Sequence, residues 1–122
     1  MKESFEELYR ILQLDRKVSP WSKNRTINER ITELNKEIVE VNQAIEKKDL
    51  QNLHEELGDT LWSVLSVIII AEERYDAKTK DIIDNVITKI KYRKPWIFNG
   101  EKMTEEDEAA QWIVAKKQEK EK

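Results

Sequence analysis

The 122-residue chain is 39% hydrophobic and 39% charged, carries a formal net charge of −3, and contains two glycines, two prolines and no cysteine. Its length fits one ordinary domain, and the scarcity of glycine and proline favours helices over sheets or disorder. The lack of cysteine excludes disulfides, zinc fingers and thiol catalysis. The acidic balance gives no support for nucleic-acid binding, which usually needs a basic face.

No segment of the sequence is typical of export or membrane insertion. The N-terminal residues MKESFEELYR have no apolar core of the kind that a signal peptide needs. The apolar run VLSVIII is interrupted by serine and is far shorter than the roughly 20 residues that span a bilayer. We therefore expect a cytoplasmic protein with no membrane partner and no nucleic-acid partner.

Five helical segments are expected from the spacing of apolar residues. They cover about residues 3–14, 27–47, 50–74, 78–93 and 104 onward. A loop around Pro20 follows the first, Asp49 can cap the third, Pro95 ends the fourth, and TEED at 104–107 resembles a capping box. Because short connections favour antiparallel neighbours, the prediction is an all-α antiparallel helical bundle, with four main helices plus a C-terminal helix.

The bundle is expected to form a single domain over residues 1–122, with a frayed tail at 116–122, and to self-associate. An apolar stripe along the second helix alternates steps of four and three, which is typical of a bundle seam. Its members are Ile27, Ile31, Leu34, Ile38, Val41 and Ile45. The third helix is apolar on a wider arc over residues 64–70, which requires two neighbours. We therefore predict a homodimer or a dimer of dimers.

Two pairs of acids repeat a spacing of three residues: Glu37 and Glu40 in KEIVE, then Glu56 and Asp59 in HEELGD. Residues three apart lie on the same face of a helix. The short KKD turn should make these two helices antiparallel and bring the turns of Glu40 and Glu56 to similar heights. The four acids are then expected to converge, and Gly58 to let a neighbouring backbone come close.

Four converging carboxylates repel each other by roughly 1–4 kcal/mol per close pair at a surface-like dielectric, so a cation should lie among them. Oxygen-only ligands suit Mg²⁺, with Mn²⁺ as an alternative. A ferritin-like di-iron site would need Glu-x-x-His, but the only histidine, His54, has Gln51 three residues before it. The alternative interpretation is a solvated border of the seam in a non-catalytic helical interaction module.

An ordered series of motifs resembles the MazG family of nucleoside triphosphate pyrophosphohydrolases over nearly the whole chain. The motifs are PWSK at 20–23, KEIVE at 36–40, ELGD at 56–59, K-x-x-x-R at 89–93, P-x-I-F at 95–98 and W-x-x-x-K-K at 112–117. ELGD alone is a weak signal, whereas the full series is specific. One departure is that Lys36 stands where the family's EExxE pattern has its first glutamate. Glu33, one turn before Glu37, could partly replace that acid.

The resemblance implies a MazG-like fold and Mg²⁺-dependent hydrolysis of a nucleoside triphosphate between the α- and β-phosphates, giving NMP and pyrophosphate, with nucleotide-pool housekeeping as a possible role. It also implies that Glu37, Glu40, Glu56 and Asp59 are the metal ligands. A carboxylate that is not fully used as a ligand can accept the proton of the attacking water, and Glu37 or Glu40 is expected to be this catalytic residue.

The phosphates and the base need other residues. Lys89 and Arg93, four apart on one helix, form a basic pair suited to the triphosphate, and Lys23 could add a third contact. Trp21, Trp96 and Trp112 are candidates for stacking on the base, and Trp112 is preferred because it aligns with the tail tryptophan of the family. Their alternatives are ordinary surface charge for the cations and core lids for the tryptophans. Phosphoribosyl-ATP pyrophosphohydrolase and dUTPase- or dCTPase-like enzymes of the same fold remain alternative activities, which the PWSK and tail motifs disfavour.

Overall fold

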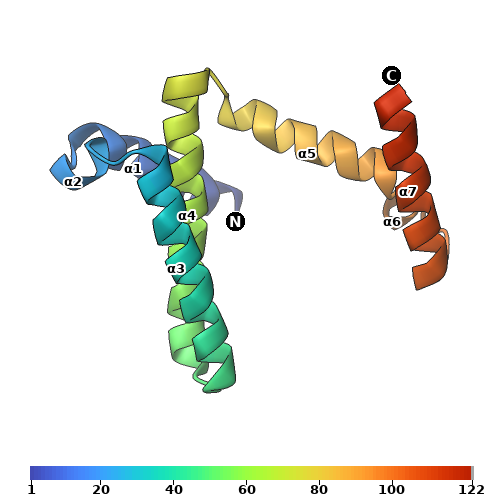
Figure 1. The fold of residues 1–122 in the computed structure, drawn as a ribbon, viewed down its shortest axis with the longest axis horizontal. Helices are drawn as coiled ribbons and strands as arrows, with labels where there is room; N and C mark the ends of the chain where they lie inside the picture. Colours follow the sequence, from blue (N-terminus) through green and yellow to red (C-terminus); the bar gives the residue numbers. More distant parts are fainter. Residues whose placement is uncertain (122) are drawn as a thin grey trace. The chain divides into compact units, whose positions relative to one another are not determined.

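The structure, a computed structural model, describes residues 1–121, which contain seven helices and no strand (Figure 1). The chain divides into two compact units, Met1–Thr79 and a second unit that begins at Lys80. The first contains α1 (Lys2–Val18), α2 (Pro20–Lys23), α3 (Ile27–Glu46) and α4 (Leu50–Tyr75). The second consists of α5 (Thr79–Arg93) from its second residue on, α6 (Trp96–Asn99) and α7 (Glu105–Glu121). Among residues 1–121, no helix is long and apolar enough to cross a bilayer.

The turn between α3 and α4 makes these two helices antiparallel neighbours, as predicted (Figure 1). Lys48 has a φ of 54°, and the backbone N–H groups of Lys48 and Asp49 donate to the carbonyls of Ile45 and Ala44. This is the Schellman arrangement, here with lysine in place of the usual glycine. The Asp49 side chain then accepts from the Asn52 N–H at 3.1 Å and caps α4, which confirms the expected cap.

The expected loop around Pro20 is instead the short helix α2. Proline occupies its first turn, where a backbone N–H has no helical partner to lose. Two residues separate its C-cap Asn24 from α3, whose N-terminus is fixed by a capping box. The Thr26 hydroxyl accepts from the Glu29 N–H at 3.1 Å, and the Glu29 carboxylate accepts from the Thr26 N–H at 3.0 Å.

An apolar core joins α1 to the C-terminal half of α4. Leu12, Leu65 and Ile69 are buried together. Partly buried side chains surround them: Phe5, Leu8, Tyr9, Trp62 and Ile68. The apolar face of α1 therefore packs on the wide apolar arc of α4.

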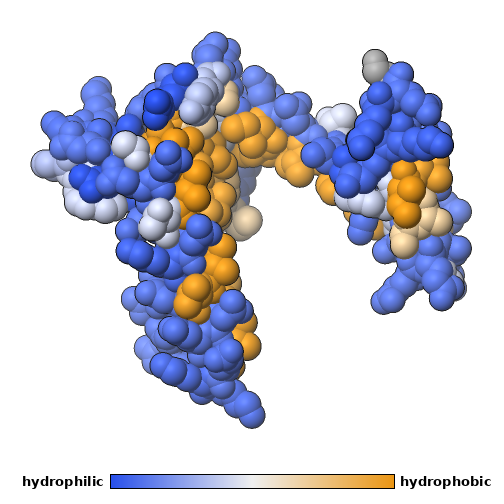
Figure 2. All heavy atoms as spheres, viewed as in Figure 1, coloured by the Kyte–Doolittle hydropathy of each residue, from blue (hydrophilic) through white to orange (hydrophobic). Residues whose placement is uncertain are grey.

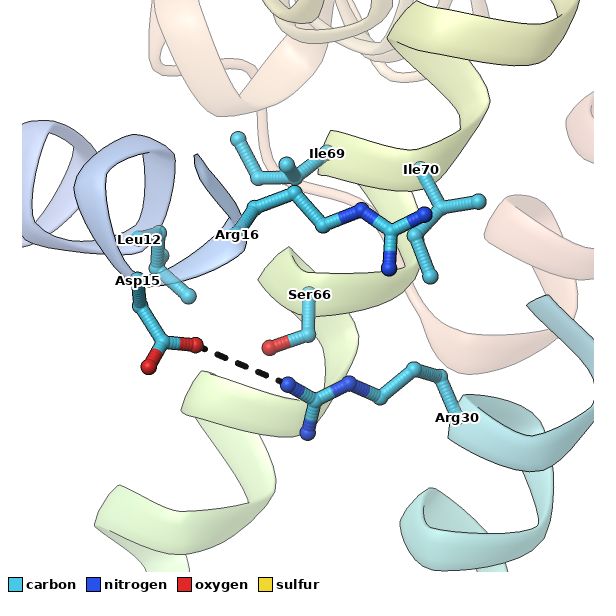
Figure 3. A pocket seen from close by; sticks show the side chains of 7 residues that line it. All are labelled: Leu12, Asp15, Arg16, Arg30, Ser66, Ile69 and Ile70. Atoms are coloured by element: carbon cyan, nitrogen blue, oxygen red, sulfur yellow. Dashed lines mark ion pairs between the residues drawn. The ribbon is translucent and has the colours of Figure 1, made fainter. Parts of the chain in front are cut away.

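A buried polar network fixes α2 against α1 and α3, and Figure 3 shows its ion pair between Asp15 and Arg30. The Arg30 side chain is only 7% exposed, and a buried guanidinium needs partners to offset its lost hydration. It forms an ion pair with Asp15 at 3.7 Å and donates to the Ser22 hydroxyl at 3.2 Å. Ser22 in turn donates to Asp15, and Arg16 donates to the backbone carbonyls of Ser22 and Arg25.

The predicted four-helix seam is not closed within the first unit. One edge of the α3–α4 pair presents a run of apolar side chains, which Figure 2 shows in orange. Ile38 is 46% exposed and Leu57 is 53% exposed, and Ile31, Ile45 and Leu61 are exposed as well. Half of the alternating stripe thus faces α4, and the other half remains accessible.

In the second unit, α7 begins at a reciprocal cap. The Thr104 hydroxyl accepts from the Asp107 N–H, and the Asp107 carboxylate accepts from the Thr104 N–H, which confirms the capping role expected of TEED. Trp96 is buried and donates its indole N–H to Glu108 at 2.8 Å. The helix continues to Glu121, and Lys122 lies outside the described residues. The single domain and the frayed tail stay predictions.

Candidate functional site

The antiparallel pair α3–α4 brings acids of both helices together. Glu37 from α3 and Glu56 and Asp59 from α4 each offer one carboxylate oxygen, and these atoms lie within 4.8 Å of one another. Two oxygen ligands of one Mg²⁺ lie at most about 4.2 Å apart, at twice the usual metal–oxygen distance. Small rotations of exposed or half-buried side chains cover that difference.

Two oxygens in this acid cluster (Glu37, Glu40, Glu56 and Asp59) are buried without a donor. They are one carboxylate oxygen each of Glu37 and Glu56, for which residues 1–121 supply no hydrogen-bond partner. Because a buried, unsatisfied carboxylate is costly, these atoms require either a proton or a cation. The donor set, which consists only of carboxylate oxygens, fits a hard divalent cation.

The pKa values of two acids reflect the same crowding. The pKa of Glu56 is raised to about 7, first by its side-chain contact with Glu40, then by burial and by its contact with Glu37. Burial, followed by the charge of Glu40, raises the pKa of Glu37. A contact between two carboxylates becomes a hydrogen bond only when one of them is protonated, which is why the proton is retained. A bound cation would take over the role of that proton.

The fourth predicted ligand, Glu40, contacts Glu56 but does not belong to the group of oxygens within 4.8 Å. Its side chain is exposed, as is that of Asp59, and it contacts Glu37 as well as Glu56. Glu33, a candidate to replace the acid lost at Lys36, instead forms an ion pair with Lys36 at 3.7 Å. The expectation for Gly58 is wrong within the described residues, because a Cβ placed there meets nothing within 4 Å.

The predicted phosphate-binding cations Lys89 and Arg93 both lie on α5. Lys89 is exposed, whereas the Arg93 side chain is 12% exposed and forms a two-pronged ion pair with Glu119 of α7. The guanidinium carbon of Arg93 also lies 4.7 Å from the centroid of the Trp112 ring. Trp112 lines an open pocket together with Lys94, Glu105, Glu108 and Ala109.

The other predicted base contact, Trp21, lies on α2 and is 49% exposed. The guanidinium groups of Arg25 and Arg30 lie 4.9 and 4.8 Å from the centroid of its ring. Such cation–π contacts fix the ring and leave about half of the side chain accessible. Lys23, at the end of the same short helix, is exposed.

Two residues that the sequence reasoning missed are prominent around these side chains. Arg30 lies three residues after Ile27 and four before Leu34, next to Ile31 and on the same face as the apolar stripe. A charged residue at that spacing was the available signal. Glu119 lies seven residues after Trp112, two helical turns along the same face, and this spacing was the available signal. It was missed because the neighbouring lysines and glutamates are typical of a solvated tail.

Comparison with known proteins places these residues in a family context. Residues 25–98 match the family model of the MazG nucleotide pyrophosphohydrolase domain. That segment contains all four predicted metal ligands together with Lys89 and Arg93, and it excludes Trp21, Trp112 and Glu119.

Two curated relatives are named nucleoside triphosphate pyrophosphohydrolase. The protein from Mycobacterium tuberculosis is 34% identical over 107 residues, which cover 86% of this chain and 33% of the relative. The protein from Mycolicibacterium smegmatis is 32% identical over 103 residues, which cover 83% of this chain and 32% of the relative. The chain thus spans about a third of the length of these relatives.

A crystal structure of a MazG-related protein from Thermotoga maritima is similar over almost its whole length. The TM-score is 0.87 at 36% sequence identity, and the match covers 92% of this chain and 98% of the other. This likeness confirms the all-α, MazG-like fold that the motifs implied. The chain therefore belongs to the MazG nucleotide pyrophosphohydrolase family.

Proposed function

We propose that this protein is a Mg²⁺-dependent nucleoside triphosphate pyrophosphohydrolase that cleaves between the α- and β-phosphates and releases NMP and pyrophosphate. The observation that carries the proposal is the pair of buried carboxylate oxygens on facing helices, Glu37 and Glu56, which have no donor among residues 1–121. Family membership and the names of the two mycobacterial relatives support the same substrate class. Mn²⁺ has the same preference for oxygen and is an alternative cofactor.

The proposed division of labour follows from the donor chemistry. Glu37, Glu56 and Asp59 would hold the cation, and Glu40, which contacts Glu37 and Glu56, would complete the set or accept a proton. When bound, Mg²⁺ neutralises phosphate charge and acidifies the attacking water. Either Glu37 or Glu40 acts as the general base, because a carboxylate not saturated by the cation keeps basic lone pairs.

Lys89 and Arg93 are proposed to bind the phosphates, with Lys23 as a further contact. A guanidinium offers parallel N–H donors that match two phosphate oxygens, and an ammonium adds a point charge. Trp112 and Trp21 are proposed to stack on the base. Both have nearby cations that hold the ring in place, and Trp112 borders an open pocket.

A homodimer or dimer of dimers is proposed as the working assembly. The exposed apolar edge of α3–α4, with Ile31, Ile38, Ile45, Leu57 and Leu61, supports it, because contiguous apolar surface of this kind usually marks an interface.

The first prediction concerns the products. With millimolar Mg²⁺ and a panel of ribo- and deoxyribonucleoside triphosphates, we expect pyrophosphate and the matching NMP, and no turnover after chelation. Ion-exchange chromatography of the products is the measurement. NDP and orthophosphate as the only products would refute the cleavage position, and strict selectivity for dUTP or dCTP would favour the alternative activities.

A second prediction separates the acid cluster from a solvated border. Glu56→Gln and Asp59→Asn keep the shape of the side chain and remove its charge, so each should lower turnover by about 10³-fold or more if the acids hold the cation. Glu55→Gln, a charge change on an exposed neighbour, is the matched control and should retain activity. Steady-state kinetics at saturating Mg²⁺ measures this. Wild-type rates in both cluster variants would place the metal site elsewhere.

A third prediction follows from the pKa of Glu56, which is about 7 in the folded protein against an ordinary value of 4.5. Between these two values the folded state keeps a proton that the unfolded chain has released, so this group makes stability fall as pH rises. In metal-free buffer, the melting temperature of the wild type should therefore decline from about pH 5 to about pH 7 relative to that of Glu56→Gln. Millimolar Mg²⁺ should remove the difference, because the cation stabilises the ionised form. If the melting temperatures of the wild type and of Glu56→Gln changed equally with pH in the presence of chelator, the raised pKa of Glu56 would be contradicted.

The fourth prediction concerns assembly. If the exposed edge of α3–α4 is an interface, Leu57→Glu should introduce an unpaired charge into it and shift the protein toward monomer, whereas Glu55→Gln should not. Multi-angle light scattering at micromolar concentration gives the mass directly. A monomeric wild type under these conditions would rule the assembly out.

A further inference from the structure

Glu119 occupies the hydrogen-bonding face of Arg93. The Arg93 Nε and Nη2 atoms donate to its two carboxylate oxygens at 3.1 and 2.8 Å, and the Arg93 side chain is only 12% exposed. This paired arrangement is the same geometry in which a guanidinium binds two oxygens of a phosphate. Arg93 cannot offer these two donors to Glu119 and to a phosphate at once.

Glu119 also lies in a field of several positive charges. The hydrogen bond from Arg93, and then the charges of Arg93, Lys89 and Lys116, lower the pKa of Glu119, so the carboxylate is ionised at neutral pH. These cations come from both helices, Lys89 one turn before Arg93 on α5 and Lys116 one turn before Glu119 on α7. A site with this charge and fork geometry suits any compact oxyanion, and the carboxylate is the anion that the chain itself provides.

The Arg93–Glu119 ion pair is not the only contact between α5 and α7. The Tyr92 hydroxyl donates to Gln118 at 2.8 Å, and the Trp112 ring stacks near Arg93 and Lys94. At its other end, α7 is held to α6 by the Trp96–Glu108 hydrogen bond. Loss of the Glu119 charge therefore leaves α7 with several other contacts.

We propose that Glu119 is a built-in competitor for the phosphate site, an acidic latch on the C-terminal helix that must leave Arg93 before an oxyanion can bind there. The proposal rests on the proposed phosphate-binding role of Arg93. Substrate affinity is then reduced by the fraction of molecules in which the latch is closed. Glu119 lies outside residues 25–98, so the latch belongs to a part of the chain that the family model does not match.

The test uses inorganic pyrophosphate as the probe, with binding to the full-length protein measured by isothermal titration calorimetry in chelator. Glu119→Gln preserves shape and removes the charge that competes, and should tighten binding by about twofold to fivefold, the range expected for a partly exposed ion pair. Glu119→Asp keeps the charge on a shorter side chain that reaches Arg93 less well, and should give a smaller gain. Glu121→Gln removes the same charge from an exposed position on the same helix, and should leave the affinity near that of the wild type.

The outcomes separate the latch from the proposed function. Unchanged or weaker pyrophosphate binding in Glu119→Gln, together with weaker binding in Arg93→Gln, would overturn the latch and leave Arg93 as a phosphate ligand. No effect of Arg93→Gln would overturn both assignments. A gain of equal size in Glu121→Gln would also overturn the latch, since it would reflect net charge alone. Tighter binding in Glu119→Gln, with a melting temperature near that of the wild type, supports the latch even if no nucleotide is hydrolysed.

Discussion

The antiparallel register of α3 and α4 is the constraint on which the candidate metal site depends. The turn at Lys47 to Asp49 sets that register through its two backbone hydrogen bonds and the Asp49 cap. A slip of one residue would rotate the helix faces by about 100°, because an α-helix has 3.6 residues per turn. Glu37 would then no longer oppose Glu56. The relative position of the acids on α3 and α4 therefore depends on the three-residue turn that joins the two helices.

Apolar packing holds together acids that would separate if they were free. Val41 and Ala44 on α3 and Leu53 on α4 are at least partly buried beside the acid cluster, and this burial offsets the repulsion between ionised carboxylates. The rise in the pKa of Glu56 is the measurable consequence of that conflict. The repulsion between these carboxylates lowers the stability of the folded protein. A bound cation would remove that repulsion, so cation binding is favoured and stabilises the fold.

The second unit also gathers like charges, but there the charges are positive and a carboxylate compensates them. Its cations on α5 lie close to one another, and Glu119 of α7 supplies the compensating charge. In the first unit, one carboxylate oxygen each of Glu37 and Glu56 has no donor among residues 1–121, while in the second unit the guanidinium of Arg93 is paired with Glu119. Both clusters are built on helices, whose fixed geometry keeps like charges close without relying on flexible loops.

Much of the fold and of the acid cluster was predictable because it depends on local rules. Helix positions follow from apolar spacing, the capping roles of Asp49 and TEED follow from side-chain chemistry at helix ends, and the three-residue spacing of acids fixes a shared face. A short turn then leaves two long helices little choice but to pack antiparallel. The motif series identified the family because it covers nearly the whole chain in order.

Tertiary structure decided what depends on contacts between distant residues. Proline in PWSK begins a helix, because Arg16 and Arg30 bind the carbonyl and hydroxyl groups of Ser22, partners that lie on other helices. Glu40 was expected to converge with the other three acids and contacts Glu37 and Glu56, although its oxygens do not belong to the group that lies within 4.8 Å of one another. Glu119 reads as one more charge in KKQEKEK, and only the packing of α7 on α5 directs it to Arg93. The sequence by itself determined the five longer helices and the acids that share a face, because these follow from local periodicity, and it indicated the family through an ordered series of motifs. Only the folded chain decided which charges meet, because ion pairs between helices depend on packing that local spacing does not specify.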